Sequence, residues 1–191
     1  MLITRTSPLT VENWPDLEDL FGERGACGGC WCMYWRLTRA DYASGDANRQ
    51  AFHALVKDGE PTGLLAYAED GANGGEHAIG WCAVSPRSAF ARLKTSRVGR
   101  GGTDEPGRWS VPCFYVRAGH RRRGGADTLL AAACDYARDH GAEVIEGYPT
   151  TSPKAAASDL YVGTRGLFER NGFTVASRPT ASRLVMERRC G

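Results

Sequence analysis

The sequence predicts an α/β domain with a mixed central sheet of about seven strands flanked by helices. Short apolar runs with strand character alternate with helical periodicities, in the order β-α-α-β-β-β-α-β-α-β-β. The chain has 191 residues and shows no internal repeat and no interdomain linker. A chain of this length can bury one core, so we expect a single domain over residues 1–191.

The N-terminal part should form one strand and two helices, over residues 1–8, 14–21 and 48–57. The first helix has clear boundary signals, because Asn13 is a suitable N-cap, Pro15 lies in the first turn and Gly22 can end the helix. A Gly- and Cys-rich loop over residues 23–36 separates the two helices.

A meander of three strands is predicted next, over residues 63–68, 77–84 and 109–116. Residues 71–75 have turn chemistry and should join the first two strands. The second connection, residues 86–108, is long, basic and without a clear pattern. Such connections are uncommon unless they are functional or disordered.

The C-terminal half alternates strand and helix, with strands near 144–148, 174–176 and 183–187. The clearest helix of the chain is predicted over residues 127–140, with Gly141 as its stop. A last helix should end near Asn171, before Gly172, with Phe173 packing back on it.

Composition and charge are those of an ordinary soluble protein and argue against a nucleic-acid or membrane protein. The net charge is +2, and the basic residues form no stripe with interleaved aromatics, which argues against nucleic-acid binding. No apolar window of about 18 residues and no signal peptide is present, so we expect no membrane span and a cytoplasmic location. The seven cysteines should then be thiols.

The segment between the third meander strand and the clearest helix has the features of an anion site. Its core is R-x-x-G-x-A, at Arg121, Gly124 and Ala126. The first turn of a helix has unpaired N–H groups, and Gly124, Gly125 and Ala126 allow a diphosphate to approach them. Arg121 and Arg123 can add charge-assisted bonds. The alternative is a Gly-rich turn with solvated arginines. The motifs of NTPase phosphate loops and of dinucleotide folds are absent.

At three places the chain resembles the GNAT superfamily of N-acetyltransferases. Residues 113–126 match the acyl-CoA signature Q/R-x-x-G-x-G/A, and residues 144–149 match the strand that lies beside it in that fold. Residues 166–173 are similar to the Y-E-x-x-G-F ending of the family.

This resemblance implies acetyl-CoA as co-substrate and direct attack of an amine on the thioester, without an acyl-enzyme. It also implies that the parallel strands 109–116 and 144–148 splay apart at the centre of the sheet and admit the pantetheine arm. The residues expected to bind the cofactor are Phe114, Tyr115, Val116, Arg121, Arg122, Arg123, Gly124, Gly125, Ala126, Tyr161, Thr164 and Phe168.

The catalytic base is not at its usual place, because the strand 109–116 contains no acidic residue. Glu146, on the neighbouring strand, is our candidate base. The alternative is that Glu146 points outward or pairs with an arginine. Asp104 and Glu105 are weaker candidates. Phe168 occupies the position at which the family often has a tyrosine that protonates the leaving thiolate.

The loop around residues 23–36 is the expected acceptor site. Trp31, Tyr34 and Trp35 are predicted to form an aromatic wall, whereas Arg36 and Arg87 are predicted to bind an acceptor carboxylate. Plain core packing is the alternative for the aromatic residues and Arg36, and a solvated loop is the alternative for Arg87.

The cysteines of this loop, Cys27, Cys30 and Cys32, do not predict a metal site. Their C-x-x-C-x-C spacing provides three thiolates, but a closed zinc site needs a fourth ligand, and no second motif provides it. We therefore expect no metal and a role for this segment in lining the acceptor pocket.

The sequence thus predicts an N-acetyltransferase acting on a primary amine of a small molecule. A protein acetyltransferase, acting on lysine or an N-terminus, and a catalytically weak acyl-CoA-binding protein are the alternatives. A homodimer through the C-terminal strands is also possible.

Overall fold

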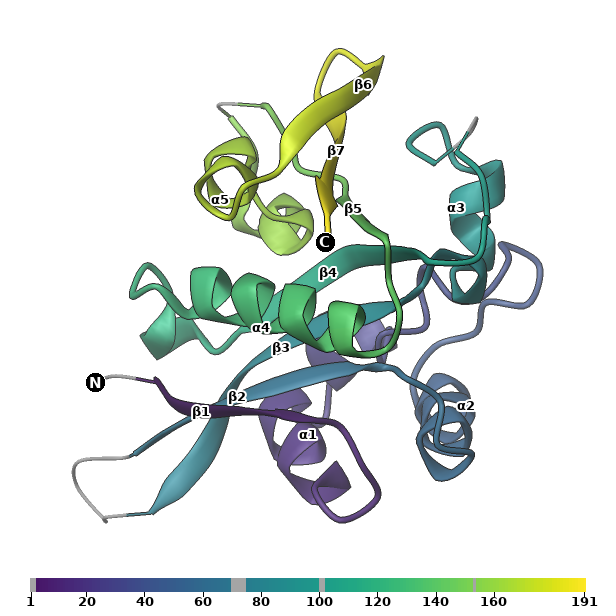
Figure 1. Ribbon diagram of the computed structural model, residues 1–191. Helices are drawn as coiled ribbons and strands as arrows, with labels where there is room; N and C mark the ends of the chain where they lie inside the picture. Colours follow the sequence, from purple (N-terminus) through teal and green to yellow (C-terminus); the bar gives the residue numbers. More distant parts are fainter. Residues whose placement is uncertain (1–2, 70–74, 100–101, 153) are drawn as a thin grey trace.

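The computed structural model describes residues 3–69, 75–99, 102–152 and 154–191 (Figure 1). One mixed sheet has the strand order β1-β2-β3-β4-β5-β7-β6, which confirms the predicted α/β fold. The strands are β1 (Ile3–Pro8), β2 (Gly63–Glu69), β3 (Glu76–Pro86), β4 (Arg108–Val116), β5 (Val144–Gly147), β6 (Thr174–Thr180) and β7 (Arg183–Arg189). The α-helices are α1 (Trp14–Phe21), α2 (Asp46–Lys57), α3 (Ala91–Thr95), α4 (Gly125–Asp139) and α5 (Arg165–Arg170). None of the described helices is long and apolar enough to cross a membrane.

Strands β4 and β5 form the parallel pair at the centre of the sheet, and they separate as the sequence predicts. Their register runs only from Arg108↔Val144 to Val111↔Gly147, whereas β4 continues to Val116. Residue 112, directly after the last paired residue of β4, is a proline and has no backbone N–H to donate. The edge of β4 that faces β5 therefore has no β5 partner beyond Val111.

Helices cover both faces of the sheet, and β3 shows why. Its residues alternate between two apolar clusters, since Cys82 and Val84 pack in the cluster of α4 while Trp81 and Ala83 pack in the cluster of α1 and α2. Figure 1 shows α4 on one face of the strands, with α1 and α2 on the other. Because both faces of β3 are covered, all residues from 78 to 85 are buried.

Two predicted details differ from the structure. Asn13 does not cap α1; its side-chain oxygen accepts from the Thr10 N–H at 2.8 Å and its amide donates to the Pro8 carbonyl at 2.9 Å. Asn13 therefore holds the turn before the helix. The connection 86–108 is not wholly irregular, because it contains the short turn η2 (Arg87–Ala89) and α3. Residues 1–2 of the predicted first strand and residues 71–74 of the predicted turn lie outside the described residues.

A glycine at the end of β5 is required by the packing of α5 on the sheet. A Cβ at Gly147 would lie 2.0 Å from Cε1 of Phe168, so only a glycine accommodates the ring. Phe168 also packs edge-on against Phe114 of β4 and Phe173. The sequence predicts that Phe173, which follows Gly172, packs back on the last helix, and the Phe168–Phe173 contact confirms this. This contact fixes α5 beside the point at which β4 and β5 separate.

We expect Gly147→Ala to lower the free energy of unfolding by about 1–3 kcal/mol, because the methyl group would displace the Phe168 ring from a packed core. Urea denaturation followed by circular dichroism measures this. Gly75→Ala is the matched control: a Cβ there meets nothing within 4 Å, so a change of less than about 0.5 kcal/mol is expected. Equal stability of the two variants would contradict the steric argument.

Candidate functional site

A short loop turns the chain from the end of β4 into the first turn of α4. Gly124, the residue before α4, has φ of 83°, a conformation that side chains rarely adopt, and a Cβ there would meet nothing within 4 Å. The space over the first turn is therefore open. Gly125 is buried on the other side of the backbone, where a Cβ would touch the side chains of Ile3 and Val116 at 3.8 and 3.9 Å.

The charge at this helix start is positive. Arg121, Arg122 and Arg123 are all exposed, and the Arg121 Nε donates to the Val116 carbonyl at 3.0 Å. The Arg122 and Arg123 side chains make no ion pair with the described residues. Asp127, the one acid of the first turn, is paired with Arg170 of α5 at 2.9 Å. This helix start therefore suits a diphosphate, because it offers free N–H and guanidinium groups and the charge of Asp127 is neutralised by Arg170.

A pocket of about 320 Å³ lies beside β4, where β4 has lost its parallel partner. Aromatic side chains and thiols make up most of its wall. The lining residues are Phe21, Ala26, Cys27, Cys30, Cys32, Tyr34, Trp35, Tyr42, Trp81, Cys113, Phe114, Tyr115 and Tyr161.

The ionisable groups of this wall are thiols and phenols only. No carboxylate, guanidinium or imidazole is among the lining residues. Burial raises the pKa of Tyr161 to about 12, so its hydroxyl stays protonated at neutral pH. The pocket therefore suits an apolar or aromatic body, with a few hydrogen-bonding groups at its surface.

Arg92 of α3 holds the outer wall of the pocket in place. Its guanidinium lies 4.2 Å from the ring centre of Tyr34 and 5.0 Å from that of Tyr42. It also donates to the carbonyls of Leu37 and Thr38 at 3.2 and 3.1 Å. The basic connection after β3 therefore orders the loop that carries two of the lining tyrosines.

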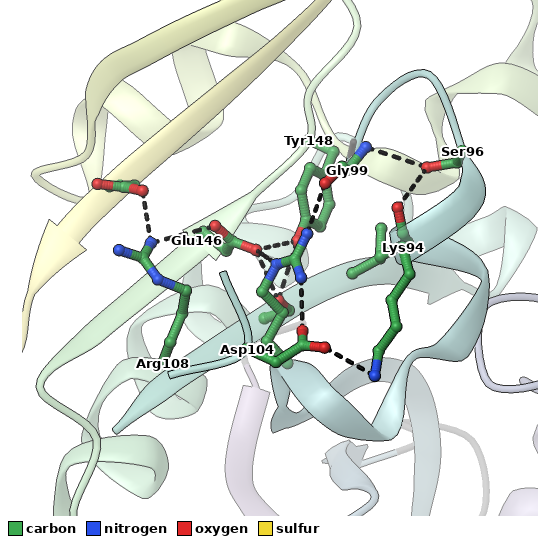
Figure 2. Close-up of polar contacts among 11 residues, drawn as sticks. Lys94, Ser96, Gly99, Asp104, Arg108, Glu146 and Tyr148 are labelled. Atoms are coloured by element: carbon green, nitrogen blue, oxygen red, sulfur yellow. Dashed lines mark hydrogen bonds and ion pairs between the residues drawn. The ribbon is translucent and has the colours of Figure 1, made fainter. Parts of the chain in front are cut away.

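Glu146, the predicted base, is buried in a polar network at the paired end of β4 and β5 (Figure 2). Its carboxylate accepts from Arg87 Nε at 2.6 Å, Ser110 Oγ at 3.1 Å and Arg108 Nη1 at 3.3 Å. The Tyr148 hydroxyl donates to the same carboxylate. The arrangement matches the arginine-paired alternative that the sequence left open, and Glu146 is not among the described residues that line the pocket.

Arg87 is the centre of the same network and does not reach the pocket. It is 1% exposed, and besides Glu146 it binds Asp104 at 2.5 Å and the Gly99 carbonyl at 2.6 Å. Asp104 in turn binds Lys94 at 2.8 Å, as Figure 2 shows. Burial and the Glu146 charge raise the pKa of the Tyr148 hydroxyl well above its usual value, which keeps it a hydrogen-bond donor.

Of the residues predicted to bind the acceptor, Tyr34 and Trp35 line the pocket, and three others do not. Trp31 packs over Gly25, where a Cβ would lie 2.2 Å from its ring nitrogen, and stacks on Trp14, so it holds the loop from behind. Arg36 is buried and donates to the Thr62 carbonyl and Ser85 Oγ. Neither Arg36 nor Arg87 is placed to bind an acceptor carboxylate.

The residues predicted to bind the cofactor also divide. Phe114, Tyr115 and Tyr161 line the pocket, whereas Thr164 caps α5 by accepting from the Leu167 N–H at 3.3 Å. Phe168 has no exposed surface. It therefore supports the cleft from the core and offers no surface to a cofactor.

Sequence reasoning missed several lining residues, among them Tyr42, Trp81 and Cys113. Trp81 and Cys113 are predicted as ordinary strand residues, and Tyr42 lies in a loop without a recognisable pattern. The lining thiols are not arranged as a metal centre. Within the part of the chain that the structure describes, no group of three or more His, Cys, Asp or Glu side chains could hold a metal ion.

Comparison with protein-family models gives a match to the acetyltransferase (GNAT) family over residues 14–173. A search of curated proteins gives no significant match. The family match spans both the candidate phosphate site at α4 and the pocket.

Solved structures with the same fold share little sequence with this chain. The GNAT domain of S. lividans PAT has a TM-score of 0.57 at 21% identity, over 97% of this chain and 89% of that one. Ribosomal-protein-alanine N-acetyltransferase from Brucella melitensis has a TM-score of 0.54 at 14% identity, over 97% and 99% of the two chains. PaiA N-acetyltransferase from Thermoplasma acidophilum, solved with coenzyme A, has a TM-score of 0.50 at 14% identity, over 99% of both chains.

We expect Glu146→Gln to destabilise the protein by about 1–3 kcal/mol, because it removes the buried carboxylate from Arg87 and leaves Asp104 as its remaining ion-pair partner among the described residues. Urea denaturation at neutral pH provides the measurement. Glu169→Gln is the control, since it removes the same charge from an exposed pair with Arg165 and should change stability by less than about 0.5 kcal/mol. A Glu146→Gln variant as stable as the control would show that the network contributes little.

Proposed function

The chain belongs to the acetyltransferase (GNAT) family, and from this premise we propose that it moves an acetyl group from acetyl-CoA to a primary amine of a small molecule. The amine attacks the thioester directly, while both substrates are bound. One observation carries the choice of acceptor: the aromatic pocket lies beside the part of β4 that is no longer paired with β5.

The residues at the start of α4 fit the diphosphate of a coenzyme A ester. Open space over Gly124, unpaired N–H groups in the first turn and the free Arg122 and Arg123 side chains support this position. The backbone of Phe114, Tyr115 and Val116 then runs along the gap left by β5, where its edge can bond to the pantetheine arm. Acetyl-CoA supplies the activated acetyl group when bound.

The pocket supports direct attack by bringing the acceptor to the same strand segment. Cys113, Phe114 and Tyr115 all line it, so an amine inside lies next to the stretch of β4 that would hold the thioester. Holding both substrates in one geometry removes much of the entropic barrier. Backbone N–H donors near the thioester oxygen stabilise the charge that develops there.

The pocket wall favours an amine carried on an apolar or aromatic body. Eight of the lining residues are aromatic, and faces of such rings attract an ammonium group. A polyamine or aminoglycoside would need carboxylates, which the lining lacks. An amino acid would need a free arginine, whereas Arg36 and Arg87 are bound elsewhere.

The cofactor site is tested by titrating acetyl-CoA into the wild type and into Gly124→Glu by calorimetry. We expect the variant to lose at least about tenfold in affinity, or about 1.4 kcal/mol, because it places bulk and negative charge where the diphosphate would lie.

Gly141→Glu is a matched control for this experiment. Gly141 has φ of 82° and equally open space, but it lies at the opposite end of α4. The affinity of the Gly141→Glu variant for acetyl-CoA should equal that of the wild type. Absence of binding by the wild type would remove the basis of the acetyltransferase proposal.

The acceptor class is tested with a panel of amines and detection of released coenzyme A thiol. We expect arylalkylamines such as 2-phenylethylamine to be acetylated with a higher kcat/KM than spermidine, kanamycin or glutamate. Turnover of lysine-containing or N-terminal peptides in place of small amines would instead identify a protein acetyltransferase.

A further inference from the structure

The reaction proposed above needs a base, and the pocket wall contains no carboxylate or imidazole to act as one. An acceptor amine is mostly an ammonium at neutral pH and must lose a proton before it attacks. Glu146 is enclosed by two arginines, Ser110 and Tyr148, and is not among the described residues that line the pocket. The candidates that remain at the wall are the thiols and phenols.

Among these groups, Cys32 has the surroundings that stabilise an anion. Its sulfur accepts a hydrogen bond from Trp81 Nε1 at 3.1 Å, and an indole nitrogen can only donate. The Cys113 thiol and the Arg36 guanidinium also act on the Cys32 sulfur. The effect of Cys113 is the largest, and together these neighbours lower the pKa of Cys32 below its usual value.

Arg36 supports this assignment independently, because it is a buried cation without an ion pair. Its side chain is buried, and no carboxylate among the described residues lies within ion-pair distance. Its Nη2 bonds to two neutral oxygens, and its Nε has no partner. A buried charge is costly unless an opposite charge is near. The acidic groups that act electrostatically on Arg36 are Cys32 and, with a smaller effect, Glu60. A thiolate at Cys32 therefore provides the larger part of the opposite charge.

The local backbone presents Cys32 to the pocket in a conformation that side chains rarely adopt. Trp31 and Cys32 have φ of 42° and 60°, respectively. Trp31 anchors the turn against Gly25, so the following residue is directed to the wall between Trp81 and Cys113.

We propose that Cys32, as a thiolate held by Trp81, Cys113 and Arg36, is the base that deprotonates the acceptor ammonium. This inference rests on the proposed function. One N–H proton of the ammonium passes to the Cys32 sulfur, and the freed nitrogen lone pair forms the C–N bond. The C–S bond to coenzyme A then breaks, and the thiolate of coenzyme A takes the second nitrogen proton. Cys32 returns its proton to solvent.

The groups that act on Cys32 define its pH dependence. They are Arg36 from its own loop, Cys30 beside it, Cys113 of β4 and Cys82 of β3. Burial and Cys32 raise the pKa of Cys113, so Cys113 stays a thiol and donates. We therefore expect activity to fall as pH drops below the pKa of Cys32, at a lower pH than an ordinary thiol would give.

The ionisation of Cys32 is tested first, because this measurement needs no acceptor amine. The wild type is alkylated with iodoacetamide over a range of pH, and modification of Cys32 is followed by peptide mass analysis. We expect a midpoint below about 8.5, the value of an ordinary thiol. Cys113→Ala should raise that midpoint by removing a donor. Cys134→Ala is the matched control, since it removes a buried core thiol with a pKa of about 11 and should leave the midpoint unchanged.

The catalytic role is tested with acetyl-CoA and 2-phenylethylamine. We expect Cys32→Ser to lower kcat by about 10²–10⁴-fold and to remove the acidic limb of the pH profile. Cys113→Ala should shift that limb to higher pH. Thermal unfolding and acetyl-CoA calorimetry show whether each variant folds and binds acetyl-CoA. If the wild type itself does not bind acetyl-CoA, the proposed function is wrong, and this outcome says nothing about Cys32.

Three results would overturn the proposal. One is a midpoint of Cys32 alkylation at or above the pH expected for an ordinary thiol, and this measurement needs no acceptor amine. Another is a folded, acetyl-CoA-binding Cys32→Ser variant with unchanged kcat and pH profile. The third is an acetyl group found on Cys32 by intact mass after incubation with acetyl-CoA, which would make the thiolate a nucleophile in place of a base.

Discussion

The buried ion pair between Arg87 and Glu146 sets the closed end of the cleft on which the rest of the site depends. It ties the turn after β3 to β5, and Arg108 extends the same network through Glu146 to Glu187 of β7. Four elements are thereby held together where β4 and β5 are paired. Beyond Val111, β4 is no longer paired with β5, and Pro112 has no N–H to donate, whereas the pairing of β4 with β3 continues to Val116.

The two ends of the cleft have opposite chemistry. The start of α4 combines free backbone N–H groups with exposed guanidinium groups, whereas the described residues that line the pocket are mostly aromatic and include no carboxylate, guanidinium or imidazole. A polyanionic donor and an apolar amine would each meet complementary surroundings, so neither substrate competes well for the position of the other. The phenylalanine cluster of Phe114, Phe168 and Phe173 packs α5 against β4.

Local signals in the sequence predicted most of the fold. Helix ends at Gly22 and Gly141 follow from left-handed backbone that glycine adopts readily, and the element order follows from apolar periodicity. The separation of β4 and β5 followed from the family resemblance, through the residues of the acyl-CoA signature. Helix α3 was missed because five residues are too few to show a periodicity.

The site was harder to predict because its roles depend on contacts between distant residues. Arg87 and Glu146 are 59 residues apart, and charged side chains are normally exposed, so their burial has no local signature. Arg36 was expected at the surface of the acceptor site for the same reason. The cysteines of the loop were expected at the pocket, but the contribution of Trp81 and Cys113 to the surroundings of Cys32 requires knowledge of the strand register.

The two walls of the pocket come from different parts of the chain. Residues 26–42 provide the outer wall from a loop that contributes no strand to the sheet, whereas the inner wall belongs to β3, β4 and the turn before α5. Insertions or substitutions in that loop can reshape the cavity while the strands and the start of α4 remain as they are. The shape of the pocket can therefore evolve through changes in about one tenth of the sequence, while the phosphate-site geometry at α4 is inherited unaltered.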